Sequence, residues 1–425
     1  MSSFLDRLGV PRRINAAGTL TRLGGALMAP EVLEAMREAA ASSVDMAELQ
    51  SAASRRIAAL TGAEAGLVTS GASAGLTLAT AACLAGWDAA RMAALPDTAR
   101  MPARMLMLRT HRNSYDHAVR LAGAQIVDVG HNDRGTGAGV RGLEPWEIES
   151  AIDAQTAGFV FVAGAGGAAG TGALPVVVEV MQRHGLPVVV DAAAQLPPAA
   201  HLRRFVEQGA DLVVFSGGKA LGGPQASGLL LGRRALVGSA LLQMMDMDVH
   251  PATWAPAELV DTACLRGTPL HGIGRGFKVG KEEIAGLLCA LERFVACDET
   301  ARAEAWTQRL RAIAAGLDGA PRLQAVLLET RPGGRAVPAL ELTVGAGGRG
   351  DPAAAAALCR QLQAQDRPVH LAEDRLDEGV LLVNPIALAP QDDAALVASL
   401  RAALAQGAEG PEAASAGGLP AASSP

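Results

Sequence analysis

Short apolar runs alternate with segments of helical periodicity through the middle of the chain, and this alternation restricts the fold more than any other feature. The runs predicted as strands are residues 65–69, 105–109, 124–129, 158–163, 187–191, 211–216 and 228–232. The segments predicted as helices are residues 73–85, 115–122, 145–152, 176–184 and 201–208. Such alternation is typical of βαβ units around a mostly parallel sheet. The sequence therefore predicts a large α/β domain.

The remainder of the chain predicts a smaller α+β domain. Residues 280–298 carry apolar side chains at three-to-four-residue spacing, which predicts a long helix. Further helices are predicted at 299–316, 352–365 and 391–405, and further strands at 323–330, 339–344, 369–371 and 379–383. The expected parts are an N-terminal segment (1–45), a large domain (46–275), a linking helix (276–298), a small domain (299–406) and a disordered tail (407–425).

Charge and cysteine content argue against several classes of function. The formal net charge of −6 disfavours a nucleic-acid surface. The five cysteines form no C-x-x-C pair, so neither a metal site nor a disulfide framework is indicated. Residues 65–87 are uncharged and long enough to span a bilayer, but their Gly, Ser and Thr content favours a buried strand and helix. With no apolar stretch typical of a signal peptide, we expect a soluble, cytoplasmic protein without a membrane partner.

Lys219 is the residue that points most directly to chemistry. It follows the apolar run 211–216 and lies among glycines. A lysine at the end of a buried strand is costly unless it is used, because desolvation disfavours its charged form. Desolvation also lowers the pKa of the amine and makes it nucleophilic, as Schiff-base chemistry requires. The residues alone leave open whether Lys219 holds a carbonyl cofactor or lies on the surface of a turn.

Three further features follow predicted strands, where open α/β sheets bind ligands. The loop 69–73 precedes a helix, and its small residues offer free amides to a phosphate. Asp191 ends the apolar run 187–191, so it either pairs with a cation or caps a helix. His111 follows the run 105–109, where its ring is either structural or placed to stack on a cofactor.

A competing motif lies at residues 164–169. The sequence Gly-Ala-Gly-Gly-Ala-Ala fits a loose G-x-G-x-x-A dinucleotide pattern. A helix should begin at once in such a motif, whereas the first good helical pattern here starts after Pro175. We therefore expect no nicotinamide cofactor.

The order of these features, phosphate loop, histidine, aspartate and lysine, resembles that of fold-type-I pyridoxal 5'-phosphate (PLP) enzymes. The resemblance is closest to the SelA-like branch of the class V aminotransferase-like enzymes, which includes ammonia-lyases and selenocysteine synthases. The segments that carry it are residues 14–25, 111–117, 190–197, 215–225 and 272–284. It implies the fold-type-I PLP-dependent transferase fold, with a large domain, a mostly parallel sheet and a smaller α+β C-terminal domain.

The resemblance also implies the roles of individual residues. Lys219 would form the Schiff base and move protons, Asp191 would pair with the pyridinium nitrogen, and His111 would stack on the ring. The other cofactor-binding residues it implies are Ser70, Gly71, Ala72, Ser73, Ala193, Gln195 and Ser216. The candidates for binding the substrate carboxylate are Arg22, Arg112 and Arg275, each of which could instead form a structural ion pair.

The reaction favoured by the resemblance is elimination of the β-hydroxyl of a hydroxylated or sugar-derived amino acid, which gives a 2-oxo acid and ammonia. Gly218 stands where desulfurase-like relatives have a histidine, which argues against that chemistry. The family-like region begins near Arg12, so a tRNA substrate is not expected. A PLP-dependent racemase or aminotransferase, a SelA-like transferase and a non-catalytic PLP-binding protein also remain open. The resemblance further implies a homodimer or higher homo-oligomer.

Overall fold

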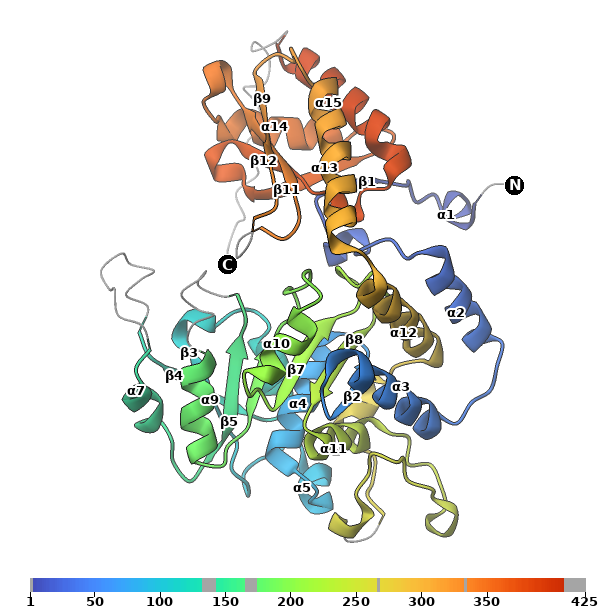
Figure 1. Ribbon diagram of the computed structural model, residues 1–425, viewed down its shortest axis with the longest axis vertical. Helices are drawn as coiled ribbons and strands as arrows, with labels where there is room; N and C mark the ends of the chain where they lie inside the picture. Colours follow the sequence, from blue (N-terminus) through green and yellow to red (C-terminus); the bar gives the residue numbers. More distant parts are fainter. Residues whose placement is uncertain (1–2, 132–142, 165–173, 266–267, 332–334, 409–425) are drawn as a thin grey trace, which may run out of the picture. The chain divides into compact units, whose positions relative to one another are not determined.

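The computed structural model describes residues 3–131, 143–164, 174–265, 268–331 and 335–408. The chain divides into two compact units (Figure 1). Residues 24–299 form the large unit, and residues 1–23 join residues 300–425 in the small unit. The sequence treated 1–45 and 276–298 as separate segments, whereas the structure groups 24–45 and the whole of 276–298 with the large unit. The predicted tail largely lies outside the described residues.

The large unit contains a seven-stranded sheet in the order β2-β8-β7-β6-β5-β3-β4. The strands are β2 (Ala65–Thr69), β3 (Arg104–Leu108), β4 (Gln125–Val129), β5 (Thr156–Val162), β6 (Val188–Asp191), β7 (Leu212–Ser216) and β8 (Gly228–Gly232). Only β8 runs antiparallel to its neighbours, β2 and β7. All seven predicted strands are therefore present, within two residues of the expected bounds, and the predicted α/β class is confirmed.

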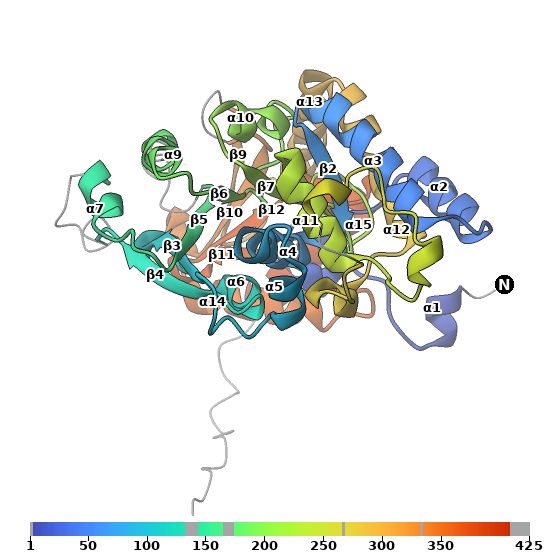
Figure 2. The ribbon, with the colours of Figure 1, turned by 90° about the horizontal axis from the view of Figure 1, so that it is seen from below.

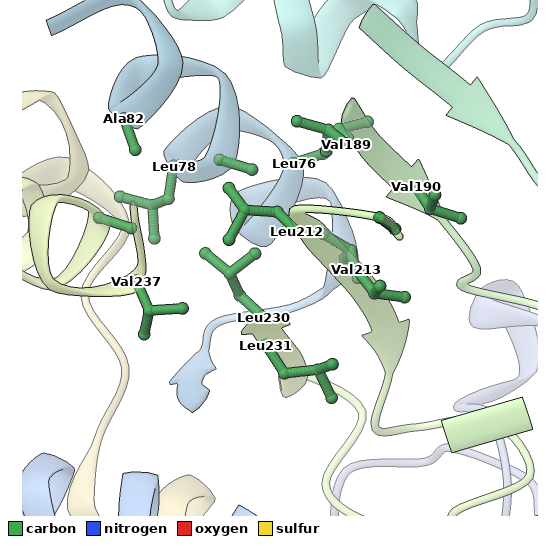
Figure 3. Packing of buried hydrophobic residues seen from close by; sticks show 14 of the residues in the cluster. Leu76, Leu78, Ala82, Val189, Val190, Leu212, Val213, Leu230, Leu231 and Val237 are labelled. Atoms are coloured by element: carbon green, nitrogen blue, oxygen red, sulfur yellow. The ribbon is translucent and has the colours of Figure 1, made fainter. Parts of the chain in front are cut away.

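Helices cover both faces of this sheet. Figure 2 shows α9 (Leu174–Arg183) and α10 (His201–Glu207) on one face, and α4 (Ala72–Ala85) and α6 (Asp116–Leu121) on the other. The uncharged stretch 65–87 forms β2 and α4, both in the core, as the sequence predicted. Leu76 and Leu78 of α4 lie on the same face of the sheet as Leu212 and Leu230 (Figure 3). No helix of the described chain is long and apolar enough to cross a membrane.

Several elements of the large unit were not predicted. They are α2 (Pro30–Ala40), α3 (Met46–Thr61), α5 (Ala89–Ala94) and α11 (Arg234–Met244), and α7 (Pro145–Glu149) is shorter than predicted. Helix α2 packs against α12 (Lys281–Ala296), the long helix that the sequence did predict. Gly286 permits this approach, because a Cβ there would lie 2.7 Å from Met36 Cγ. The absence of a side chain at Gly286 of α12 thus allows α2 to pack closely.

The small unit has a five-stranded sheet in the order β1-β11-β12-β10-β9. Its strands are β1 (Ile14–Ala16), β9 (Leu323–Leu328), β10 (Ala339–Val344), β11 (Val369–Arg375) and β12 (Val380–Val383). Its helices include α13 (Glu299–Gly316), α14 (Pro352–Gln363) and α15 (Asp393–Ala408). Strand β1 was not predicted; it pairs in parallel with β11, with Ile14 opposite Val369. The first strand of the chain therefore completes a sheet made from its last third.

Candidate active site

Three strands of the large unit, β2, β6 and β7, end in polar residues at the same end of the sheet. Thr69 at the end of β2 and Ser216 at the end of β7 both pair with Gly228 of β8. On the other side of β7, Asp191 of β6 pairs with Val214 and also with Val162 of β5. Carboxyl ends of parallel strands form the ligand-binding edge of open α/β sheets. The predicted phosphate loop, aspartate and lysine segments therefore share one edge.

Asp191 and Lys219 form the electrostatic centre of this edge. Burial raises the pKa of the Asp191 carboxyl, although the Ala193 N–H, which donates to Oδ1 at 3.0 Å, and the Lys219 charge both oppose the rise. Burial likewise lowers the pKa of the Lys219 amine, and the Asp191 charge opposes that shift. Each charge thus partly offsets the pKa shift that burial causes in the other group. The amine is neutral over a wider pH range than an exposed lysine, as a nucleophile or base requires.

The loop that carries Lys219 is held by its own backbone. Gly217 N–H donates to Ser227 O, Gly222 N–H to Lys219 O and Gly223 N–H to Gly217 O, each at 2.9 Å. A Cβ at Gly218 would lie 2.7 Å from the Gln225 Cα and would overlap the Gln225 side chain. A side chain at position 218, such as the histidine of desulfurase-like enzymes, therefore does not fit this loop.

A segment near the N-terminus lies against the lysine loop, a contact that was not predicted. The Ala26 N–H donates to Gly218 O at 3.0 Å. Gly25 has φ +74°, and a Cβ there would overlap the Gln225 amide and lie 2.6 Å from Gly218 O. The only signal in the sequence was the adjacent pair Gly24 and Gly25. This close crossing makes residues 24–26 a support for the Lys219 backbone.

Gly24 and Gly25 provide a matched pair of variants to test this support. Both have positive φ, so alanine at either position incurs about 1–2 kcal/mol of left-handed strain. A Cβ at Gly24 meets open space, whereas a Cβ at Gly25 displaces the lysine loop. We expect Gly25→Ala to weaken PLP binding and turnover at least about tenfold more than Gly24→Ala, since small misplacements cost large factors in rate. Cofactor titration and steady-state kinetics measure this, and equal effects would contradict the support.

The predicted phosphate loop forms a tight turn into α4. Gly71, at φ +122°, is the N-cap of α4 and supplies no side-chain cap. The Thr69 hydroxyl donates to Gly71 O at 2.9 Å, and the Ser70 hydroxyl donates to Phe277 O at 2.7 Å. A Cβ at Gly228 would lie 2.6–2.7 Å from Gly71 C and Ala72 N. The amides at the start of α4 therefore lack a side-chain acceptor from the N-cap, which suits an anion.

His111 is buried, at 1 % exposure, just beyond β3. Its Nδ1 accepts the Val162 N–H at 3.1 Å, which leaves the ring proton of the neutral form on Nε2. Nε2 is buried and has no hydrogen-bond partner among the described residues. Burial lowers the pKa of His111 to about 4, so the ring is neutral at neutral pH. Its edge contacts Phe161, with the ring centroids 4.7 Å apart.

Gln195 links two strand ends of this edge. Its Nε2 donates to Ala163 O, after β5, at 3.0 Å, and a Cβ at Gly164 would lie 2.5 Å from the same Nε2. Gln195 therefore orders the backbone that leaves β5. Most of the dinucleotide-like motif at 164–169 lies beyond the described residues.

Each of the three candidate arginines lies near a carboxylate of its own unit. Arg112 pairs with Asp116 at 2.6 Å and with Asp128, and Arg275 pairs with Asp246 at 2.6 Å. Arg22 belongs to the small unit, where Nη2 lies 3.9 Å from Glu373 Oε1. Arg112 and Arg275 are thus engaged by carboxylates of their own chain, which favours structural roles. The Arg22 contact is the longest of these ion pairs.

Known proteins resemble this chain over most of its length. The family described as SelA, L-seryl-tRNA selenium transferase, matches residues 176–246. A 5'-C-glycyluridine monooxygenase-decarboxylase from Streptomyces sp. is 34 % identical over 406 residues, covering 93 % of this chain and 90 % of that protein. The D-glucosaminate-6-phosphate ammonia lyase of Salmonella typhimurium is 32 % identical, covering 94 % and 97 %.

A solved structure of a D-glucosaminate-6-phosphate ammonia-lyase superposes with a TM-score of 0.79 at 30 % identity. The match covers 96 % of this chain and all of that one. The region matched by SelA includes both Asp191 and Lys219. The chain therefore belongs to the SelA-like family of fold-type-I pyridoxal-phosphate enzymes.

Proposed function

We propose that this protein is a PLP-dependent ammonia-lyase acting on a β-hydroxylated, sugar-derived amino acid. The substrate would lose its Cα proton and its β-hydroxyl as water, and hydrolysis would then release ammonia and a 2-oxo acid. The observation that carries the proposal is the Lys219–Asp191 pair, in which burial lowers the lysine pKa at the sheet edge. The near full-length similarity to the Salmonella typhimurium enzyme supports the reaction class.

The residues at the sheet edge fit PLP. A phosphate suits the uncapped amides of Ala72 and Ser73, and the buried carboxylate of Asp191 suits a ring cation. The unpartnered Nε2–H of His111 supplies a donor that the described protein atoms do not satisfy. Bound PLP would stabilise negative charge at the substrate Cα.

The chain's own groups would then manage protons and position. The Lys219 amine would take the Cα proton, because its lowered pKa keeps a share of it neutral. The same group, once protonated, would give a proton to the leaving hydroxyl. Asp191 would keep a positive charge on the ring nitrogen, and an arginine would bind the substrate carboxylate. We further propose a cytoplasmic homo-oligomer, as the family resemblance implies.

A second candidate function follows from the relative in Streptomyces sp., whose identity of 34 % is as high as that of the ammonia lyase. That protein is a monooxygenase-decarboxylase, so its reaction needs dioxygen. The two reactions differ in co-substrate and in product. An ammonia-lyase releases ammonia without dioxygen, whereas a monooxygenase-decarboxylase consumes dioxygen and releases carbon dioxide.

The test is a paired aerobic and anaerobic assay of the PLP-loaded protein. A panel of D- and L-β-hydroxyamino acids, including amino-sugar acids and their phosphates, is scored for ammonia, 2-oxo acid and carbon dioxide. We expect ammonia and 2-oxo acid in equal amounts at the same rate in both atmospheres. Dioxygen-dependent release of carbon dioxide would support the second candidate. Racemised substrate without ammonia would instead indicate a racemase, and amino transfer that needs an added oxo acid would indicate an aminotransferase.

A further inference from the structure

The large unit contains a cavity of about 580 Å³. Neither Lys219 nor Asp191 lines this cavity. Its walls come from the start of α3, the end of α11, the connection that follows it, and the residues leading into α12. The apolar lining includes Met46, Leu241, Met244 and Val249. A cavity of this size accommodates a small organic molecule.

Two buried nitrogen donors in the lining lack partners within the described chain, and the exposed Lys278 supplies a cation beside them. Trp254 Nε1 and Arg275 Nε are buried and have no hydrogen-bond acceptor. Unsatisfied buried donors are costly, so each is better accommodated when an acceptor enters the cavity.

The acidic residues of the lining are already engaged. Asp45 caps α3 by accepting the Ala47 and Glu48 N–H groups at 2.8 and 3.0 Å. Asp246 accepts from Arg275 at 2.6 Å, and Glu282 lies 3.8 Å from Lys281. Lys281 in turn donates to backbone carbonyls at the end of α2. The lining therefore holds three acidic and three basic side chains, and Lys278 is the base among them with no ion pair to another described residue.

We propose that this cavity binds a small organic acid. The carboxylate of the ligand contacts Lys278, Trp254 and Arg275, and its apolar body packs against the methionine, leucine and valine side chains of the lining. A carboxylate offers acceptors to both buried donors, and the apolar lining excludes ligands that are polar throughout. This cavity is separate from Lys219 and Asp191. The segment 273–277 connects it to the predicted phosphate loop, because Phe277 O accepts the Ser70 hydroxyl.

The test is calorimetric titration of the full-length, PLP-loaded protein with three probes. Benzoate has the charge and an apolar ring, benzyl alcohol has the ring alone, and acetate has the charge alone. We expect benzoate to bind one site per chain at least about tenfold more tightly than either of the others. Lys278→Gln and Trp254→Phe should each weaken benzoate binding by about tenfold or more, with Lys278→Arg largely restoring it.

The control is Trp146→Phe, which alters an exposed tryptophan outside the cavity and should leave the benzoate affinity unchanged. Circular dichroism confirms that each variant is folded. Three results would overturn the proposal. They are equal affinity for benzoate and benzyl alcohol, benzoate binding that ignores both cavity variants, and a change of oligomeric state in Trp254→Phe, which would assign the cavity to an interface with a second copy.

Discussion

Replacement of Lys219 by alanine is expected to reduce turnover by at least about 10³-fold, because one group is asked to act as both nucleophile and proton carrier. The visible absorbance band that PLP gives when joined to a lysine should also disappear. Absorbance spectra of the PLP-loaded protein and steady-state ammonia release measure the two effects. The structure supports Lys219 as the site, since burial lowers the pKa of its amine.

Lys219→Arg is the matched control for this variant. It keeps a positive charge beside Asp191, but a guanidinium neither joins an aldehyde nor gives up its proton at neutral pH. We expect it to be as inactive as Lys219→Ala while remaining closer to the wild type in stability. An absorbance band or rapid turnover that survives in either variant would refute the assignment of Lys219.

Asp191→Asn is expected to lower turnover by about 10²–10³-fold, because a neutral asparagine would no longer hold a positive charge on the ring nitrogen of bound PLP. The effect on the stability of the cofactor-free protein should have the opposite sign. Burial raises the pKa of Asp191, so the folded protein holds that proton more tightly than the unfolded chain. Stability is therefore lost as the pH rises through the interval between the unfolded and folded pKa values, and the loss persists at neutral pH.

Asparagine resembles the protonated carboxyl and removes this penalty. Urea unfolding should show that Asp191→Asn is more stable than the wild type at neutral pH and similar to it at acid pH. Asp211→Asn is the contrasting variant, because Asp211 already accepts from Val188 N at 2.8 Å and Arg233 Nη1 at 2.9 Å. It should be less stable than the wild type at neutral pH. Equal stabilities of wild type and Asp191→Asn at neutral pH would mean that burial of the Asp191 carboxylate does not destabilise the folded protein.

The sequence predicted the sheet and the centre of the site because both depend on local patterns. Apolar runs that end in a polar or glycine residue marked Asp191 and the lysine loop directly. Helix α3 escaped prediction because it turns polar side chains inward: Gln50 bonds the backbone of Val68, and Ser54 accepts the Gly66 N–H at 3.0 Å. Those buried polar groups interrupt the apolar periodicity by which a helix is recognised.

Contacts between segments far apart in the chain likewise could not be predicted from the sequence. Gly25 supports the loop at Gly218 only after the chain has folded, and a pair of glycines does not name its partner. The cavity near Trp254 and Lys278 depends on four separate segments, which no local pattern of the sequence brings together. The ion pairs of Arg112 and Arg275 were one of two open interpretations, which only the positions of Asp116 and Asp246 could separate.

The pairing of β1 with β11 has a consequence for biosynthesis. A ribosome that adds about 5–20 residues per second would make the two strands roughly 20 to 70 seconds apart. The large unit is continuous in sequence, so its sheet can form while the rest of the chain is still being translated. The large unit can therefore fold in the nascent protein before β1 pairs with β11.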